Sequence, residues 1–298
     1  MAHVTSLKPK TVAQILARGI VTLAKVTQSA RSDGSILMAH ALGHDREWLI
    51  AHGESFMTKP QAEKFAAYCD RRATGMPVAY IIGSAWFYGR EFIVNDKVLV
   101  PRPETEHLVD EAVEYLRARA NPNLPKALLT VLDVGVGCGA IGCSIAAEVP
   151  NAAIEATDTS QGALKVAEHN ARRLHVFNRC RFYLGDLVEP VSSRHYDVVV
   201  ANLPYIPTAD IPVPPDPVGF EPREALDGGS DGLDHYRRFV SSLPRLLKPG
   251  GTALMEAAPP VMSGLIAVTQ AAFPQARVEA RTDYGGQQRY VRVQAPGR

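Results

Sequence analysis

Apolar residues recur at helical spacing in the first part of the chain, and no strand-like run interrupts residues 11–74. The clearest helix follows Thr58-Lys-Pro-Gln61, where the threonine suits an N-cap, the proline suits the first turn and the glutamine completes a capping box. Phe65 and Cys69 then fall one turn apart on one face of that helix. We therefore predict a small bundle of short helices over residues 1–76.

The period of the pattern changes at Pro77. Apolar runs within residues 78–82, 85–88 and 91–94 are separated by glycines, which is typical of extended segments joined by hairpin turns. We predict a β-hairpin linker over residues 77–100.

Strand-like and helix-like patterns alternate over residues 101–298, which predicts a parallel sheet with helices on both faces. One connection, residues 206–231, is long and rich in proline and glycine, and such loops at strand ends are often functional lids. The fold class is therefore α/β, with a small helical domain in front. Strands are expected near 128–134, 153–157, 181–184, 197–201, 252–256, 277–281 and 289–293.

Composition narrows the classes of function. The chain has 298 residues, of which 46% are apolar, and a formal net charge of +1. It lacks the basic character of a general nucleic-acid binder, so no direct nucleic-acid partner is expected. It opens with no signal segment and contains no apolar run long enough to span a bilayer. We expect a soluble cytoplasmic protein without a membrane partner.

Neither the cysteines nor the histidines indicate a metal site. None of the four cysteines forms a Cys-x-x-Cys pair, and we expect reduced thiols. His40 and His44 lie one helical turn apart, but no third ligand accompanies them in the local pattern. No metal is predicted.

A glycine-rich stretch ends the first predicted strand of the sheet and opens a helix. In the run Leu132 to Gly139, glycines let a ligand approach the backbone where a Cβ would clash, and the helix start offers free N–H groups. The run from Gly137 to Gly142 also matches the dinucleotide pattern Gly-x-Gly-x-x-Gly, which is weak by itself. The candidates for cofactor binding here are Gly135, Val136, Gly137, Cys138 and Gly139.

The ends of the next two strands carry further candidates. Asp158 closes the second strand about 20 residues later, the position from which a carboxylate accepts both ribose hydroxyls. Asp186 follows the third strand, where it can accept from an adenine amino group, and Leu187 can contact the ring. Together these residues predict a nucleoside pocket. NAD and S-adenosylmethionine both contain adenosine, so the pocket alone does not name the cofactor.

The fourth strand decides between these cofactors, because it ends in Asn202-Leu203-Pro204-Tyr205. The amide oxygen of Asn202 and the backbone carbonyl of Leu203 can together hold both N–H bonds of one planar NH2 group. Pro204 stiffens the turn, and Tyr205 can cover the amide with its ring. An amide nitrogen is a poor nucleophile because its lone pair is delocalised, so orienting it favours attack.

Hydride transfer has no use for a paired acceptor of an amine, whereas methyl transfer to nitrogen does. We therefore predict a methyltransferase that uses S-adenosyl-L-methionine and releases S-adenosyl-L-homocysteine. No ionised base is assigned, since the nitrogen can lose its proton after it becomes cationic. Asn202, Leu203, Pro204 and Tyr205 are the candidate catalytic residues.

Several motifs, in order along the chain, resemble one family, the HemK-type protein glutamine-N5 methyltransferases that modify peptide chain release factors. The resemblance runs from Ile36 to Val293. Besides the glycine stretch and Asn202 to Tyr205, its motifs are Pro77-Val-Ala-Tyr80, Phe87-Tyr-Gly89, Val100-Pro-Arg-Pro-Glu-Thr-Glu106, Phe220-Glu-Pro-Arg-Glu-Ala-Leu226, Asp227-Gly-Gly-Ser-Asp-Gly-Leu233 and Asp283-Tyr284.

The resemblance implies an N-terminal helical domain that helps recognise a protein substrate, a β-hairpin linker, and a Rossmann-like class I methyltransferase domain over residues 101–298. The seven-stranded sheet of that domain has an antiparallel last strand. The implied partner is a class I peptide chain release factor, whose Gly-Gly-Gln glutamine is methylated. Leu203 departs from the family, where proline is usual, so the rigidity of this turn is in question.

The family also implies a role for each candidate residue. Gly135, Gly137 and Gly139 line the cofactor, Asp158 holds its ribose, and Asp186 and Leu187 flank the adenine. Asn202, Leu203, Pro204 and Tyr205 grip the target glutamine amide. Arg102 and Glu104 are candidates for substrate binding, although charges at a helix start also have a plain structural role.

Three other interpretations stay open at this point. The Asn-Leu-Pro-Tyr sequence also resembles rRNA adenine dimethylases, so an adenine in RNA or DNA is an alternative target. A glutamine of a ribosomal protein is a second, and a binding module that has lost catalysis through Leu203 is a third. Gly285-Gly-Gln287 spells the tripeptide of the release factors themselves, but a Gly-Gly turn between two strands needs no further explanation.

Overall fold

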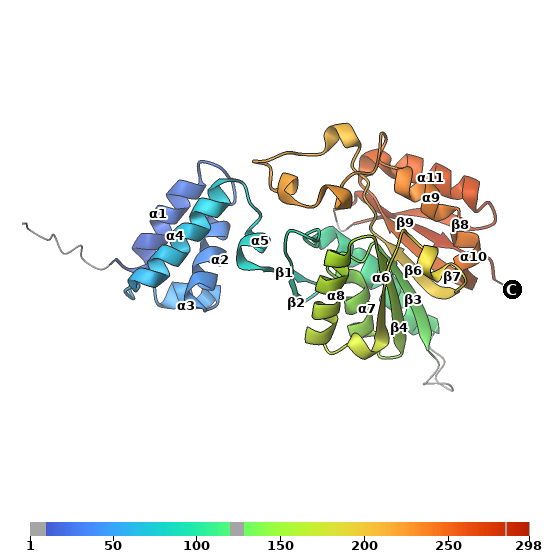
Figure 1. Ribbon diagram of the computed structural model, residues 1–298, viewed down its shortest axis with the longest axis horizontal. Coiled ribbons are helices and arrows are strands. Elements are labelled where there is room, and N and C mark those ends of the chain that lie inside the picture. Colours follow the sequence, from blue (N-terminus) through green and yellow to red (C-terminus); the bar gives the residue numbers. More distant parts are fainter. Residues whose placement is uncertain (1–9, 120–127, 284, 298) are drawn as a thin grey trace, which may run out of the picture. The chain divides into compact units, whose positions relative to one another are not determined.

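The computed structural model describes residues 10–119, 128–283 and 285–297. The chain divides into two compact units, whose helices and strands are labelled in Figure 1. One unit contains the chain up to Gly83 together with Pro212–Phe220, and the other contains Ser84–Ile211 and the chain from Glu221 onward. Within the described ranges, no helix is both long and apolar enough to cross a lipid bilayer.

The first unit is the predicted bundle of short helices. Thr58 caps α4 in the predicted capping box: Gln61 N donates to Thr58 Oγ1 at 3.4 Å, and Thr58 N donates to Gln61 Oε1 at 2.9 Å. Phe65 and Cys69 of α4 are buried in the core of the bundle. The helices are α1 (Val12–Leu23), α2 (Ala30–Leu42), α3 (Arg46–Ala51), α4 (Lys59–Ala73) and α5 (Val78–Ile82).

Residues 78–82 are helical, so the prediction of an extended segment there is wrong. α5 follows Pro77 and ends at Gly83, whose φ of 82° is left-handed, and Ile81 is buried. Periodicity cannot distinguish a short buried strand from one buried helical turn, and proline and glycine suit the two ends of a helix equally well. The hairpin that follows is confirmed, since β1 (Ser84–Phe87) pairs antiparallel with β2 (Arg90–Ile93).

The second unit is built on a sheet of seven strands in the order β5-β4-β3-β6-β7-β9-β8. All the predicted strands are present. β9 runs antiparallel to both of its neighbours, and the other pairs are parallel, as the family resemblance implied. The strands are β3 (Leu129–Val134), β4 (Ala152–Asp158), β5 (Cys180–Leu184), β6 (Tyr196–Ala201), β7 (Leu247–Glu256), β8 (Arg277–Thr282) and β9 (Gln288–Gln294).

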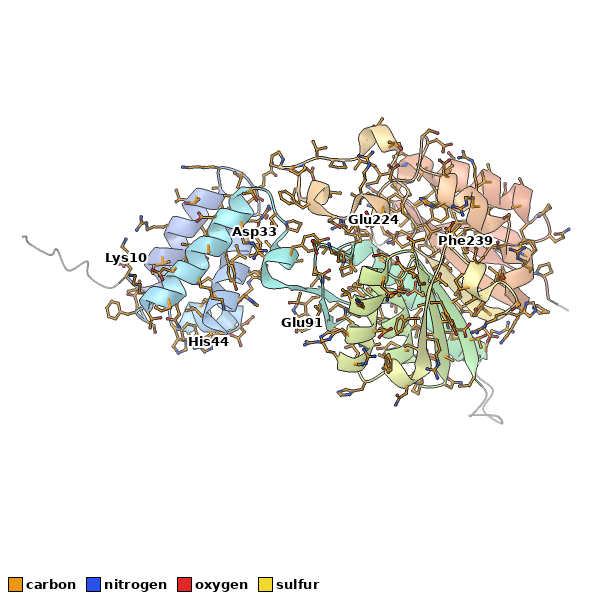
Figure 2. All side chains as sticks on the ribbon, viewed as in Figure 1. Lys10, Asp33, His44, Glu91, Glu224 and Phe239 are labelled. Carbon is orange, nitrogen blue, oxygen red and sulfur yellow. The ribbon has the colours of Figure 1, made fainter. Side chains whose placement is uncertain are left out.

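Helices cover both faces of this sheet (Figure 1). α6, α7 and α8 pack together on one face, and α9, α10 and α11 lie on the other. Every residue of β6 is consequently buried, and Phe239 of α9 is fully buried in the same core (Figure 2). The helices are α6 (Glu106–Arg119), α7 (Ala140–Glu148), α8 (Gln161–Arg173), α9 (Asp234–Val240), α10 (Leu243–Leu246) and α11 (Pro259–Ala272).

The register of the parallel strands brings distant segments to one edge of the sheet. Val134 pairs with Thr157 on one side and with Ala201 on the other. The residues that follow these strands therefore emerge next to one another at the carboxyl edge, where ligands bind in open α/β sheets. The base of the long loop after β6 is fixed there too, because Ile206 forms a backbone bridge with Asp227.

Candidate active site

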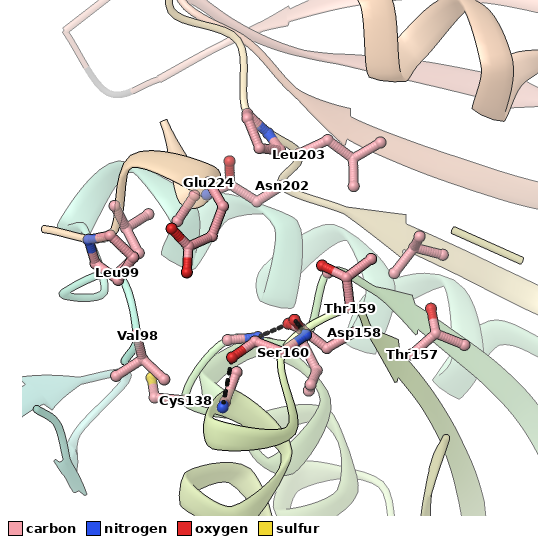
Figure 3. A pocket seen from close by; sticks show the side chains of 18 of the residues that line it. Val98, Leu99, Cys138, Thr157, Asp158, Thr159, Ser160, Asn202, Leu203 and Glu224 are labelled. Carbon is pink, nitrogen blue, oxygen red and sulfur yellow. Dashed lines mark hydrogen bonds between the residues drawn. The ribbon is translucent and has the colours of Figure 1, made fainter. Parts of the chain in front are cut away.

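A pocket lies at the carboxyl edge of the sheet, around the ends of β3, β4 and β6 (Figure 3). It brings together most of the residues that the sequence singled out. Four others, Arg102, Glu104, Gly139 and Tyr205, are not part of its lining. The predicted residues that line it are Gly135, Val136, Gly137, Cys138, Asp158, Asp186, Leu187, Asn202, Leu203 and Pro204.

The glycine loop after β3 has a backbone that favours glycine. Gly135, Gly137 and Gly139 have φ values of 75°, 52° and 82°, a left-handed region that costs other residues energy. A Cβ at Gly139 would lie 3.2 Å from the Cβ of Ala167 on α8. Gly139 therefore permits α7 to begin close to α8, beneath the pocket, whereas Gly135 and Gly137 shape the pocket itself.

Asp158, at the end of β4, is held beside the glycine loop. Gly137 N donates to its Oδ2 at 3.0 Å, and Ser160 N donates to its Oδ1 at 2.8 Å (Figure 3). Burial raises the pKa of Asp158; these two N–H groups oppose the rise, and the Glu224 carboxylate adds to it. Each carboxylate oxygen still has a lone pair for a hydroxyl group of a ligand.

Asp186, which follows β5, already has a charged partner. Arg238 of α9 donates to Asp186 Oδ2 in an ion pair. Leu187 lines the pocket next to it, with an unusual positive φ of 48° for a branched residue. One oxygen of Asp186 is thus engaged before any ligand binds, and the role of these two residues beside an adenine stays a prediction.

Asn202 and Leu203 leave β6 on the far side of the pocket. The Nδ2 group of half-buried Asn202 donates to Thr105 Oγ1 at 3.3 Å. The backbone N–H of buried Leu203 donates to Tyr236 Oη at 3.2 Å, and that hydroxyl in turn donates to the backbone carbonyl of Glu256. The turn is therefore fastened at both residues by side chains from other parts of the sheet unit.

Tyr205 does not line the pocket. Its hydroxyl donates to Glu256 Oε1 at 3.4 Å. Burial is the main cause that raises the pKa of Tyr205, and the nearby Glu256 adds to the rise. In this structure Tyr205 braces the turn, and its predicted contact with a substrate amide is untested.

Arg102 also acts as a brace. Its Nη2 donates to Glu221 Oε1 at 2.5 Å, and Val100 N donates to Glu221 Oε2 at 3.1 Å. The Glu221 side chain is 1% exposed. Its two hydrogen bonds hold residues 100–102 against the loop after β6. Glu104 is half-buried nearby and contributes negative charge near Glu256. Substrate binding by Arg102 and Glu104 stays a prediction.

Two fully buried acids support the site from below. Asp133 of β3 accepts from Gly142 N at 2.8 Å, and burial raises its pKa to about 7. Burial also raises the pKa of Glu256, at the end of β7, to about 7. Carboxyl groups with a pKa near 7 gain or lose a proton around neutral pH.

Sequence reasoning missed several of these residues. Thr105 lies inside a quoted motif, but nothing in its local pattern indicates a contact with Asn202. Glu256 ends a predicted strand at the same edge as Asp158, and this position is the signal that could have found it. Glu224 also lies inside a motif of the family resemblance, but nothing in its local pattern places it in the pocket. Tyr236 had no signal, because it reaches the site from a segment distant in sequence. In the part of the chain that the structure describes, no cluster of acids, cysteines and histidines could hold a metal ion.

Comparisons with known proteins give a consistent picture. Family models match the PrmC N-terminal domain over residues 14–83 and the methyltransferase small domain over residues 107–211. A release factor glutamine methyltransferase from Bacillus anthracis is 37% identical over 261 residues, which are 87% of this chain and 90% of that protein. Another, from Xylella fastidiosa, is 39% identical over 226 residues, 76% of this chain and 79% of that protein.

A solved structure is also similar. The protein-(glutamine-N5) methyltransferase, release factor-specific, from Alicyclobacillus acidocaldarius is 24% identical with a TM-score of 0.40. The match covers 69% of this chain and 99% of that one.

Proposed function

Because this chain belongs to the family of release factor glutamine methyltransferases, we propose that it methylates the side-chain amide nitrogen, N5, of a glutamine in a peptide chain release factor. The target is the glutamine of the Gly-Gly-Gln sequence. The chain is an S-adenosylmethionine-dependent methyltransferase, and the proposal concerns its acceptor and the residues that serve it.

The observation that carries the proposal is the fastened turn at Asn202 and Leu203. The Nδ2 end of Asn202 is engaged by Thr105, which leaves Oδ1 as an acceptor for a substrate. The N–H of Leu203 is engaged by Tyr236. We propose that Asn202 Oδ1 and the Leu203 carbonyl accept the two N–H bonds of the target amide, which holds the nitrogen in the orientation that attack requires.

The pocket has the chemistry that S-adenosylmethionine needs. Gly135 and Gly137 line it with open backbone, and Asp158 presents a carboxylate that would accept the ribose hydroxyls. Leu187 offers an apolar surface for the adenine beside Asp186. When bound, this cofactor supplies a methyl group on a positively charged sulfur.

Leu203 is compatible with catalysis in this chain. Proline, usual in the family at this position, would restrict φ but would have no N–H. Leucine restores an N–H, which a buried hydroxyl of Tyr236 accepts. A hydrogen bond thus constrains the backbone here, which argues against a binding module that has lost its catalytic site.

We also propose roles for the remaining parts of the chain. Residues 1–76 would recognise the release factor as a helical domain, residues 77–100 would form the linker, and residues 101–298 would carry out the transfer. Arg102 and Glu104 would contact the substrate near the pocket. Because translation factors are the target, the protein would act in the cytoplasm.

A labelling experiment tests this function. The purified protein is incubated with methyl-labelled S-adenosylmethionine and one acceptor at a time. The acceptors are a release factor, the same release factor with Gln→Ala in its Gly-Gly-Gln loop, a ribosomal protein fraction, and RNA. Label on the wild-type release factor alone is the expected result. Label on RNA alone would replace the proposal with an adenine target, and label on a ribosomal protein alone would move the acceptor to that protein.

A further inference from the structure

Thr105 and Glu256 form a buried brace behind Asn202. Ala201 pairs with Met255 in the sheet, so Asn202 and Glu256 leave neighbouring strands side by side. Thr105 and Glu256 are each only 3% exposed. Thr105 ends a short turn ahead of α6. Its hydroxyl oxygen accepts from Asn202 Nδ2 at 3.3 Å, and the same hydroxyl is close enough to Glu256 to lower the pKa of that carboxyl group.

The carboxyl group of Glu256 lacks a full set of partners. Tyr205 Oη donates to Oε1 at 3.4 Å, and the neighbouring Thr105 hydroxyl, a potential donor, lowers the pKa of this carboxyl. Oε2 has no partner among the described residues. A buried carboxylate is costly unless it is hydrogen bonded, so Glu256 competes strongly for the hydroxyl hydrogen of Thr105.

This competition determines which end of the Asn202 amide faces the pocket. A threonine hydroxyl has one hydrogen to donate. When Glu256 takes that hydrogen, Thr105 Oγ1 can only accept toward Asn202, and the NH2 end of Asn202 must face it. The Oδ1 end then remains for the pocket, and oxygen is the atom that accepts from an incoming NH2 group.

We propose that Glu256 is a positioning residue that fixes the amide orientation of Asn202 through Thr105. Glu256 itself does not touch the acceptor. The inference deepens the proposed function, because it names the residue that keeps the Oδ1 atom of Asn202, and not its NH2 group, facing the target nitrogen. Its expected effect on turnover rests on that proposed function.

The charge of Glu256 adds a pH dependence to this arrangement. Burial raises its pKa to about 7 and Glu104 adds to the rise, whereas Thr105, Tyr205 and Arg289 oppose it. Tyr236, from α9, donates to its backbone carbonyl. Above this pKa the carboxylate can only accept. Below it, the carboxyl hydrogen can be donated to Thr105, whose own hydrogen is then free to turn toward Asn202 Oδ1.

The test compares Thr105→Val, Thr105→Ser and Glu256→Gln with the wild type. Thr252→Val is the matched control, because Thr252 is a buried threonine on β7 whose hydroxyl bonds to Val293 O at 3.1 Å, remote from the pocket. Each variant is assayed for kcat, KM for the release factor and cofactor affinity between pH 6 and 8.5, a range of about one unit or more on each side of the Glu256 pKa. NMR spectra of isotope-labelled side-chain amides, assigned with Asn202→Ala, report the Asn202 amide directly.

Thr105→Val is expected to lower kcat by about tenfold, the effect of one hydrogen bond lost from an oriented transition state. Thr105→Ser, which keeps the hydroxyl, should recover most of the kcat lost in Thr105→Val. Thr252→Val should retain wild-type kcat, and all variants should retain cofactor affinity. In the wild type, kcat should rise with pH through about 7. Glu256→Gln should lower kcat, remove that step and shift the Asn202 amide signal.

An unshifted Asn202 signal in Glu256→Gln, or wild-type turnover with an unchanged pH step, would overturn the inference. Equal losses in Thr105→Val and Thr252→Val would also overturn it, because they would indicate general destabilisation. If the wild type transfers no label to any acceptor, the proposed function fails, whereas the amide signal still decides whether Glu256 orients Asn202.

Discussion

The two halves of the pocket are built in different ways. The half at the ends of β3 and β4 is mostly backbone: Gly135 and Gly137 adopt left-handed conformations, and Gly137 N–H reaches Asp158. The half at the end of β6 is held by side chains from distant segments: Thr105 accepts from the Asn202 side chain, and Tyr236 accepts from the Leu203 backbone N–H. The first half gives the pocket its shape, whereas the second fixes the orientation of hydrogen-bonding groups.

This difference corresponds to two tasks in methyl transfer. A cofactor needs a cradle that fits its shape, and open backbone with one well-placed carboxylate provides that. A target amide needs an exact orientation because its nitrogen is a weak nucleophile, and orientation requires acceptors that cannot rotate. Substitutions in the first half should therefore weaken cofactor binding, and substitutions in the second should slow turnover.

The largest expected effect is on turnover in Asn202→Ala. Removing one of two acceptors for the target amide should lower kcat by roughly 10²- to 10³-fold, as for the loss of a single preorganised transition-state contact. Cofactor affinity, measured by calorimetry, should stay near the wild-type value. Asn178→Ala, at an exposed position remote from the pocket, is the control. Near-normal turnover in Asn202→Ala would exclude the proposed grip.

Asp158→Ala should have the opposite signature. Without its carboxylate the ribose hydroxyls lose an acceptor, and the N–H groups of Gly137 and Ser160 lose theirs. Cofactor affinity should fall by roughly 10- to 100-fold, since hydrogen bonds to a charged group contribute ~1.5–3 kcal/mol. With saturating cofactor, kcat should recover most of its wild-type value. Asp210→Ala, which removes an exposed aspartate, is the control for the change in net charge. A loss of kcat in Asp158→Ala that saturating cofactor does not restore would contradict the difference between the two halves of the pocket.

A smaller effect is expected for Tyr236→Phe, which removes one buried hydroxyl. Leu203 N–H and the Glu256 carbonyl both lose their partner, at a cost of about 1–3 kcal/mol in the free energy of unfolding. In a Leu203→Pro background only the carbonyl is left without a partner, so the same substitution should cost less. Urea unfolding of the four proteins checks this, and equal costs in both backgrounds would mean that the Leu203 bond contributes nothing.

The sequence predicted the elements of this site better than the contacts between them. The first four predicted strands of the sheet end beside the candidate residues expected there, because buried β-branched runs and glycine turns are local signals. The braces of Asn202 and Leu203 are not local: Thr105 and Asn202 lie 97 positions apart, and Leu203 and Tyr236 lie 33 apart. Such pairs depend on how the chain is folded.

Packing also decides two other features of the chain. Substrate binding by Arg102 stays a prediction, but the folded chain adds a partner that its local pattern does not reveal, because Glu221, 119 positions away, accepts its hydrogen bond. The run at 78–82 is apolar enough for a strand, but burial of Ile81 in the helical bundle makes it a helix. Local pattern gives the residue types available, and packing decides which partner each one meets.

The most direct test of this division of tasks measures cofactor affinity and kcat together for Asn202→Ala and Asp158→Ala. Both quantities come from the same protein preparations, with the release factor as acceptor. The account predicts a crossed result, in which Asn202→Ala loses kcat and keeps affinity, while Asp158→Ala loses affinity and keeps most of its kcat at saturation. A parallel loss of both quantities in both variants would contradict it, because the two halves of the pocket would then not act separately.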